Sequence, residues 1–550
     1  MKKTIIYQLF PRWFTNLNDH CVPYGTLLEN GVGKLNDIDA RILSSIKQMG
    51  ATHVWYTGII EHATKSHFDG IEPCSPYVVK GEAGSPYAIR DYYDISPELA
   101  VNLDHRMDEF NDLVKRTHEA GLKVIIDFVP NHVARQYKSD VLPKGVVELG
   151  ANDDKNKFFE PNNNFYYITG KQFTPSIYLG EGHDAYFEMP AKATGNDCWH
   201  ASPGINDWFE TIKLNYGVDP WNGNKHFDPI PDTWNKMLDI MRFWCSKGID
   251  GMRCDMVHMV PVEFWHWAIS QIKAEYPNII FIAEIYDTSL YRSYVHYGGF
   301  DYLYDKVTLY DTLFNIIRNN ESTQSLTSCW QTVNDIRPHM LNFLENHDEL
   351  RLASPQFAGS AIKGRPALVV AATISTCPMM IYAGQELGEQ ALDAEGFSGL
   401  DGRTTIFDYW SVPSIRKWFS KKQLNSRNAL RDYYKRVLNL CNSEQAISNG
   451  ELFDLMYVNQ HLHRQYVYFR HYKGEILLIA ANFNDRPANI KVHIPRHAID
   501  LMGCKKLRDK QIELLHGAYG SFTIDEHHPL ELTIPAQDAV IWKFESSDSN

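Results

Sequence analysis

Three carboxylates in this sequence lie where a short apolar run comes to an end. The runs Gly251–Asp255 and Ile279–Glu284 each finish on an acidic residue, and Asp348 closely follows a third run. An acidic side chain at the end of a buried strand costs free energy unless it is paired or takes part in chemistry. Three such carboxylates, without a clear cluster of metal ligands, favour acid, base and nucleophilic work on a neutral, polyhydroxylated substrate.

Two of these strand ends differ in the charge state that they favour. Arg253 and Asp255 are two residues apart, so both side chains leave the same face of a strand. A guanidinium beside a carboxylate favours the ionised form, which suits a nucleophile at neutral pH. Glu284 follows apolar residues, and burial among such neighbours favours a protonated carboxyl, which suits a general acid. A buried ion pair explains each signal taken alone, so the hypothesis depends on their recurrence.

Histidines accompany two of the apolar runs. The segment Asp127–His132 places Asn131 and His132 just beyond a strand, and His347 directly precedes Asp348. Side chains of this type can hydrogen-bond the hydroxyl groups of a ligand. An ordinary turn explains each pair equally well when it is considered by itself.

Eight short apolar runs alternate with helical patterns over roughly the first 440 residues, a pattern that predicts repeated βα units. The predicted strands are Ile5–Phe10, His53–Gly58, Val124–Val129, Gly251–Asp255, Ile279–Glu284, Tyr302–Asp305, Met340–Glu345 and Met379–Tyr382. Eight parallel strands most simply close into a (β/α)8 TIM barrel, whose active site lies at the carboxyl ends of the strands. The alternative is a doubly wound open sheet, but no G-x-G-x-x-G motif follows a strand.

The pattern divides the chain into further parts. The connection after the third strand is too long for a loop, so an inserted subdomain is expected at 133–215, with the barrel formed by 1–132 and 216–445. Alternating strands then predict a C-terminal antiparallel β-sandwich domain at 446–545, and 546–550 is expected to be a disordered tail.

Composition excludes several classes of protein. The formal net charge of −13 argues against nucleic-acid binding, which needs clustered Lys and Arg. No apolar run approaches the roughly 18 residues of a membrane span. The nine cysteines are scattered without a C-x-x-C motif, which favours reduced thiols in a cytoplasmic protein.

Four short motifs, in order along the chain, resemble those of the α-amylase family of glycoside hydrolases (family 13). They are Asp127–His132, Gly251–Asp255, Ala283–Glu284 and Phe343–Asp348. The resemblance covers essentially the whole chain and implies the barrel, the insertion after strand 3 and the β-domain. It also implies that Asp255 is the nucleophile, Glu284 the general acid/base and Asp348 the stabiliser of the transition state.

The resemblance assigns further contacts to substrate. It implies that Arg253, His132 and His347 contact the nucleophile and the sugar, and that Tyr87 is a stacking platform. Many α-amylases carry Lys-His three and four positions after the nucleophile. This chain has His258 and Met259 there, so His258 is the substrate contact expected on the leaving-group side.

The same resemblance bears on metal binding. The family's structural calcium often uses the Asn of the first motif, here Asn131, and Asp153, Asp154 and Asp197 are available in the insertion. No cofactor is required for the chemistry, and Ca²⁺ is left open.

The leading functional hypothesis is a retaining α-glycoside hydrolase that cleaves α-1,4-linked glucans or maltooligosaccharides through a covalent glycosyl-enzyme. An α-glucan transglycosylase, such as a maltosyl- or 4-α-glucanotransferase, is the alternative, because it would share every catalytic residue. An inactive glycan-binding scaffold is a remote alternative that predicts loss of a catalytic carboxylate, and all three are present. The expected partner is an α-glucan oligosaccharide, with no nucleic acid and no membrane, and the oligomeric state is undecided.

Overall fold

The computed structural model describes residues 2–177, 179, 184–420, 429–502 and 511–545, and the statements below concern these residues. The tail predicted at 546–550 lies outside them.

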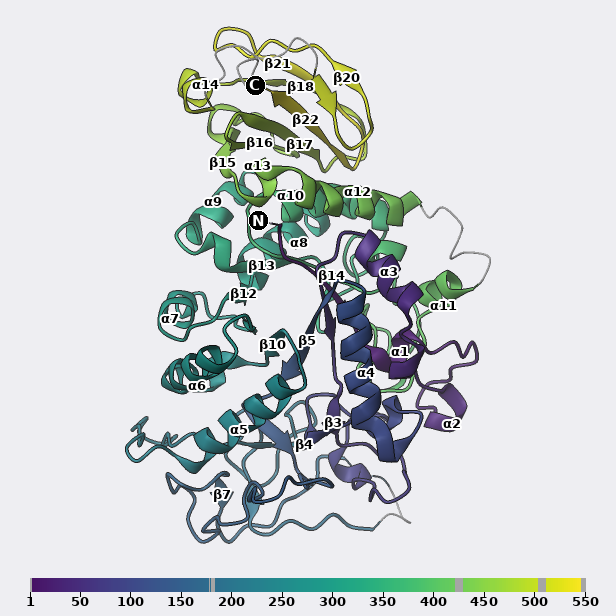
Figure 1. The fold of residues 1–550 in the computed structure, drawn as a ribbon, viewed down its shortest axis with the longest axis vertical. Coiled ribbons are helices and arrows are strands. Elements are labelled where there is room, and N and C mark those ends of the chain that lie inside the picture. Colours follow the sequence, from purple (N-terminus) through teal and green to yellow (C-terminus); the bar gives the residue numbers. More distant parts are fainter. Residues whose placement is uncertain (1, 178, 180–183, 421–428, 503–510, 546–550) are drawn as a thin grey trace.

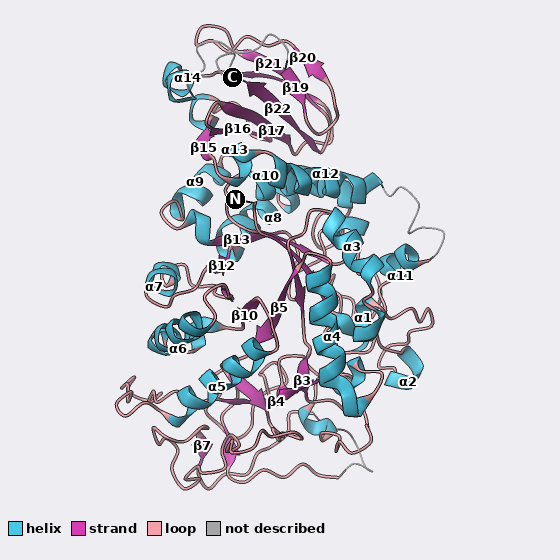
Figure 2. Ribbon diagram, viewed as in Figure 1, coloured by secondary structure: helices cyan, strands magenta, loops and turns pink. Residues whose placement is uncertain are grey.

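Eight parallel strands close into a barrel (Figures 1 and 2). Around the barrel they follow the order β1, β14, β13, β12, β11, β10, β5, β2. Their bounds are β1 (Ile5–Leu9), β2 (His53–Tyr56), β5 (Lys123–Phe128), β10 (Gly251–Cys254), β11 (Ile280–Ala283), β12 (Tyr302–Tyr304), β13 (Met340–Phe343) and β14 (Met379–Tyr382). Each coincides with a predicted strand to within two residues at either end, so the barrel is confirmed and the open sheet is wrong.

Helices cover the outside of the barrel and connect its strands (Figure 2). Their bounds are α1 (Pro11–Phe14), α2 (Leu27–Asn30), α3 (Ala40–Gln48), α4 (Arg106–Glu119), α5 (Asp232–Ser246), α6 (Val262–Glu275), α7 (Tyr291–His296), α8 (Asp311–Arg318), α9 (Ser325–Thr332), α10 (Arg365–Thr373), α11 (Pro413–Phe419), α12 (Ala429–Ser443) and α13 (Gln445–Ser448). Helix α3 shows how the sequence starts such an element, because the Asp39 side chain accepts hydrogen bonds from the backbone N–H groups of Arg41 and Ile42.

The register of three neighbouring strands brings the predicted acidic residues together. Arg253 on β10 is paired with Asp127 on β5, and Cys254 with Ala283 on β11. The residues that follow Cys254 and Ala283 therefore leave the barrel side by side, at the carboxyl ends of adjacent strands. Gly251 permits this close pairing, because a Cβ there would lie 2.7 Å from Cγ1 of Ile280.

The segment after β5 folds back on itself before the chain returns to the barrel. Strand β6 (His132–Ala134) pairs with β9 (Thr211–Lys213), and β7 (Tyr167–Ile168) pairs with β8 (Ala191–Lys192), all antiparallel. The β6–β9 pair joins the two ends of the insertion predicted at 133–215, whose bounds remain a prediction.

A second small hairpin follows β2 and was not predicted. Strands β3 (Ile60–His62) and β4 (Ile89–Ile95) pair antiparallel with two irregularities in register. Such irregular pairing leaves little periodicity for sequence reasoning to detect.

The C-terminal part is an antiparallel β-domain that lies against α10, α12 and α13 (Figure 1). It has a six-stranded sheet in the order β15, β16, β17, β22, β19, β20 and a two-stranded sheet of β18 and β21. Its elements are β15 (Glu451–Asp454), β16 (Gln465–Tyr472), β17 (Glu475–Asn482), β18 (Ala488–Val492), α14 (Arg496–Met502), β19 (Gln511–Glu513), β20 (Tyr519–Gly520), β21 (Leu530–Ile534) and β22 (Asp538–Glu545). The predicted antiparallel β-domain is confirmed, whereas its bounds at 446–545 remain a prediction.

Hydrogen bonds tie this domain to the barrel. The Tyr468 hydroxyl lies 2.6 Å from that of Thr373, and the Arg470 guanidinium donates to the carbonyl of Ile374. Within the described ranges, no helix combines the length and apolarity needed to cross a membrane.

Candidate active site

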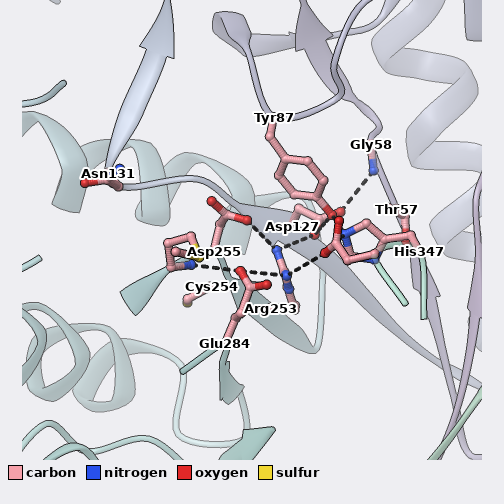
Figure 3. Close-up of polar contacts among 12 residues, drawn as sticks. Thr57, Gly58, Tyr87, Asp127, Asn131, Arg253, Cys254, Asp255, Glu284 and His347 are labelled. Atoms are coloured by element: carbon pink, nitrogen blue, oxygen red, sulfur yellow. Dashed lines mark hydrogen bonds and ion pairs between the residues drawn. The ribbon is translucent and has the colours of Figure 1, made fainter. Parts of the chain in front are cut away.

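The guanidinium of Arg253 lies between the carboxyl groups of Asp255 and Glu284, which follow β10 and β11 (Figure 3). This fully buried side chain places Nη1 2.8 Å from Oδ1 of Asp255 and Nη2 2.8 Å from Oε2 of Glu284. Its Nη2 is also 4.0 Å from Oδ2 of Asp348. The structure therefore brings the three predicted catalytic carboxylates together around one cation.

These carboxylates face a cavity of about 330 Å³ at the carboxyl ends of the strands. Asp348, with 39% of its side chain exposed, is the most accessible of the three. The other lining residues include aromatic, apolar and charged side chains: Lys80, Ser85, Tyr87, His132, Trp208, Glu210, Thr211, Met256, Tyr286, Ile406 and Phe407. Apolar faces beside a few polar groups suit a sugar ring, which carries both kinds of surface.

Asp255 and Glu284 lie beside the same Arg253 guanidinium, close enough for the charge of Glu284 to act on Asp255. Burial and the Glu284 charge raise the pKa of Asp255, and these effects outweigh the opposing effect of Arg253. Arg253 favours the ionised form of Asp255, as expected, but it does not decide the net direction of the shift. It is outweighed because Asp255 is buried and because two neighbouring carboxyls repel each other when both are ionised.

Two groups fix the carboxyl of Glu284, and the sequence analysis identified neither. The Tyr286 hydroxyl donates to Oε1 at 2.6 Å, and the backbone N–H of Met256 donates to Oε2 at 3.0 Å. Met256 has a φ of 43°, the left-handed conformation in which its N–H points at Glu284. The only sequence signal for Tyr286 is its position two residues after Glu284.

Asp348 is held in its ionised form by its neighbours. Burial acts to raise its pKa, but His347, Arg253 and Arg403 outweigh this and lower the pKa. The closest contact is from Nε2 of His347 to Oδ2 of Asp348, at 2.9 Å.

Tyr87, which lines the cavity, stacks on the buried His347 (Figure 3). Their ring centres are 5.2 Å apart, and the Tyr87 hydroxyl contacts Nε2 of His347. Nδ1 of His347 lies 2.8 Å from the side-chain amide of Gln8, a polar residue in the otherwise apolar strand β1. Of these two predicted residues, Tyr87 lines the catalytic cavity, and the buried His347 contacts both Tyr87 and Asp348.

The carboxylate of Asp127, at the end of β5, contacts Arg253 and residues at the end of β2. Its carboxylate accepts hydrogen bonds from Trp55 Nε1 at 3.1 Å and from the Gly58 N–H at 3.0 Å, and it lies 3.6 Å from Nη1 of Arg253. These contacts fix the orientation of the Asp127 carboxylate, and Asp127 in turn holds the Arg253 guanidinium in place.

The two other predicted histidines occupy different cavities. His132 lines the catalytic cavity, where burial and the nearby Lys213 lower its pKa to about 3, so its ring is neutral at physiological pH. His258 lines a neighbouring cavity instead, with its ring 6.5 Å from that of Tyr286.

Two of the residues named as candidate calcium ligands, Asn131 and Asp197, bind a lysine. Nζ of the buried Lys213 lies 2.6 Å from Oδ1 of Asn131, 2.7 Å from Oδ1 of Asp197 and 3.4 Å from the carbonyl of Met259. Asp153 is directed elsewhere, because it accepts hydrogen bonds from Asn164 and Tyr167.

An ammonium group at this position repels a second cation, so these residues do not fit Ca²⁺. Within the described residues, no group of three or more His, Cys, Asp or Glu side chains could hold a metal ion. Lys213 was not singled out from the sequence, because its partners are 82, 16 and 46 residues away.

Comparison with known proteins shows the family. The description "Alpha amylase, catalytic domain" matches residues 8–436. This chain belongs to the alpha-amylase family. It is therefore an alpha-amylase-family glycosidase, and the alternative of an inactive scaffold is not supported.

Relatives of this alpha-amylase-family chain are similar over most of its length. Alpha-amylase 3 of Dictyoglomus thermophilum is 22% identical over an alignment of 476 residues that covers 82% of this chain and 79% of that protein. An acarbose-complexed alpha-amylase structure from Geobacillus thermoleovorans covers 99% of this chain and 98% of its own, with 20% identity and a TM-score of 0.64. A cyclomaltodextrinase structure covers 98% of this chain and 78% of its own, with 18% identity and a TM-score of 0.67. At these identities the structures show a shared fold.

Proposed function

We propose that this glycosidase cleaves α-1,4-linked glucans or maltooligosaccharides with retention of configuration. The proposal is supported above all by the Arg253 guanidinium, which holds Asp255 and Glu284 at 2.8 Å each at the catalytic cavity. The binding of both carboxyls by one guanidinium favours retention, because an inverting enzyme keeps them about 6.5–9.5 Å apart to admit a water molecule.

In the first step the proposed acid Glu284 carries a proton and Asp255 is ionised. Glu284 donates that proton to the glycosidic oxygen while Asp255 attacks the anomeric carbon, so the leaving sugar departs as a neutral alcohol. Arg253 stabilises the carboxylate that is ionised at each stage, because it contacts both.

In the second step the ionised Glu284 takes a proton from water, and the hydroxide oxygen displaces Asp255 from the glycosyl ester. The ionised Asp348 hydrogen-bonds sugar hydroxyls more strongly as the ring approaches an oxocarbenium-like state, which lowers the barrier. Tyr87 and His132 contact the same sugar from the cavity wall, and His347 holds Asp348 and Tyr87 in place.

The proposal is tested by the products. A panel of maltooligosaccharides, isomaltose and trehalose is incubated with the enzyme, and the first product anomer is followed by NMR. Cleavage of maltooligosaccharides with release of the α-anomer supports the proposal. Initial release of the β-anomer, or cleavage of another linkage alone, contradicts it.

Transglycosylation is the second candidate function. It is favoured by a cavity next to the catalytic one, lined in part by His258, in which an acceptor sugar could bind. A transferase incubated with maltotriose produces chains longer than maltotriose at early times. A hydrolase produces only shorter ones at low substrate concentration.

A further inference from the structure

Two segments that line the catalytic cavity meet at one edge of it. Residues 80–85 follow β2 and β3 in the chain, residues 406–408 follow β14, and each segment contributes two side chains to the lining. The backbone N–H groups of Ala83 and Gly84 both donate to the carbonyl of Phe407, at 3.0 and 3.2 Å. A sugar chain cannot pass between two backbones at hydrogen-bond distance, so these two segments form an end wall of the cavity.

The end wall is closely packed at a glycine. Gly81 has a φ of 67°, a left-handed conformation that favours glycine, and a Cβ at this position would lie 2.2 Å from the carbonyl oxygen of Phe407. The N–H of the next residue, Glu82, donates to Oδ1 of Asp408 at 3.2 Å. The lack of a side chain at Gly81 therefore allows the two segments to touch.

A fully buried cation, Arg12 in α1, binds both segments of the end wall. Its Nη1 donates to the carbonyl of Gly84 at 3.0 Å and to that of Ile406 at 2.7 Å. Its Nη2 contacts Nε2 of His62 and lies 3.5 Å from Oε1 of Glu98. Separating the two segments would leave a buried charge without its acceptors, which is costly, so the end wall is a fixed part of the fold.

The insertion holds the other end of segment 80–85. Nζ of Lys80 lies 3.1 Å from Oε2 of Glu210, and both side chains line the catalytic cavity. These side chains are only 10% and 5% exposed, so the ion pair is largely shielded from solvent. Segment 80–85 is therefore attached both to the insertion and to the loop that follows β14.

The end wall lies opposite the proposed acid. Around the barrel, β11 is four strands away from β1 in either direction, and the neighbours of β1 are β2 and β14, which precede the two segments. Glu284 follows β11, so the end wall faces it across the cavity that both line. Because Glu284 protonates the leaving group in the proposed mechanism, the leaving group lies on its side and the rest of the substrate, the glycone, extends toward the end wall.

We propose that the enzyme attacks α-glucans from their non-reducing ends, because the end wall leaves room for only one or two glucosyl units of the glycone. This inference rests on the proposed function and specifies its substrate, which is a free chain end and not the interior of a chain. The cavity of about 330 Å³ is at the lower end of the roughly 300–1,000 Å³ that ligand sites span, which suits a short glycone.

The test compares two heptasaccharides that differ only at the non-reducing end. One is 4-nitrophenyl α-maltoheptaoside, and the other carries a 4,6-O-ethylidene group on its terminal glucose. The measured quantity is the ratio of kcat/KM for the blocked to the free substrate, with products separated by chromatography. Because the added group meets the end wall, the ratio is expected to be about 0.01 or less. The free substrate is expected to release glucose or maltose first.

Phe407→Ala should lower the end wall, because the Phe407 side chain lines the cavity, and the ratio should rise about ten-fold. Phe187→Ala is the matched control, since Phe187 is 68% exposed and is not among the described residues that line this cavity. The wild-type comparison needs no variant, so it decides the inference even if Phe407→Ala does not fold.

The inference is overturned if the wild type cleaves the two heptasaccharides with kcat/KM values within about three-fold of each other. It is also overturned if an active Phe407→Ala raises the ratio no more than Phe187→Ala does. If the wild type cleaves neither substrate, the proposed function itself is wrong, which is a distinguishable result.

Discussion

Arg253 forms a 2.8 Å ion pair with Glu284 across neighbouring barrel strands, in addition to its pair with Asp255 on its own strand. One guanidinium thus serves both carboxyls of the proposed catalytic pair. In a two-step displacement Asp255 is ionised before the first step and Glu284 before the second. Arg253 contacts both, so it is the counter-ion of the ionised carboxyl in each step.

Replacing Arg253 with lysine should disable this arrangement. A lysine ammonium is a single point charge and cannot reproduce the fork that spans two carboxylates, so kcat should fall about 100-fold or more. Denaturant unfolding should show a loss of about 3 kcal/mol, because a buried carboxylate loses its partner. Arg292→Lys is the control, since Arg292 forms an exposed ion pair with Asp335, and it should change neither quantity appreciably. Wild-type kcat in Arg253→Lys would contradict the account.

The acid side of the pH–activity profile should reflect Asp255. Its pKa is raised by burial and by Glu284, and catalysis needs it ionised, so activity falls as the pH drops through this raised pKa. Glu284→Gln removes the charge and lowers the pKa of Asp255, so the acid limb should move to lower pH. The measurement uses α-maltosyl fluoride, whose leaving group needs no proton donor, as the substrate for kcat/KM. If the acid limb of the Glu284→Gln profile stays at the same pH or moves to higher pH, Asp255 does not control that limb.

Lys213 should make the fold independent of calcium. Activity and Tm should be the same with and without EDTA, because the ammonium group already satisfies Asn131 and Asp197. Lys213→Met should destabilise the protein by about 2 kcal/mol or more, since buried oxygen atoms lose their donor. Lys491→Met is the control, because Lys491 forms only an exposed pair with Glu531. A fall in Tm with EDTA that Ca²⁺ reverses would refute this role of Lys213.

Gly251 should be sensitive to a single added methyl group. An alanine Cβ would lie 2.7 Å from Cγ1 of Ile280 and 3.1 Å from Cγ1 of Ile125, so Gly251→Ala should cost about 1–3 kcal/mol in denaturant unfolding. Gly204→Ala is the matched control, because the nearest atom there is at an ordinary 3.5 Å. Equal stabilities of the two variants would mean that strands β10 and β11 are less tightly packed than described.

The strands were predictable because each barrel strand is a short apolar run with its own local boundary signals. The acidic residues at Asp255, Glu284 and Asp348 were identifiable for the same reason, since a carboxylate directly after such a run is unusual. Their convergence followed from the topology of the barrel, in which all strands end at one rim.

The features that were missed depend on contacts between distant residues. The raised pKa of Asp255 reflects Glu284, which is 29 residues away in the chain and adjacent only through strand register. The Lys213 ammonium beside Asn131 depends on the pairing of β6 with β9 across the whole insertion. Local patterns carry no information about such partners.

The most direct test of the central claim is to trap the covalent intermediate. The enzyme is incubated with a 5-fluoro-α-maltosyl fluoride, digested with pepsin and mapped by mass spectrometry. The account predicts a single glycosyl ester on Asp255, and no label in Asp255→Asn. A label on another carboxylate, or turnover of the reagent without any ester, would contradict it.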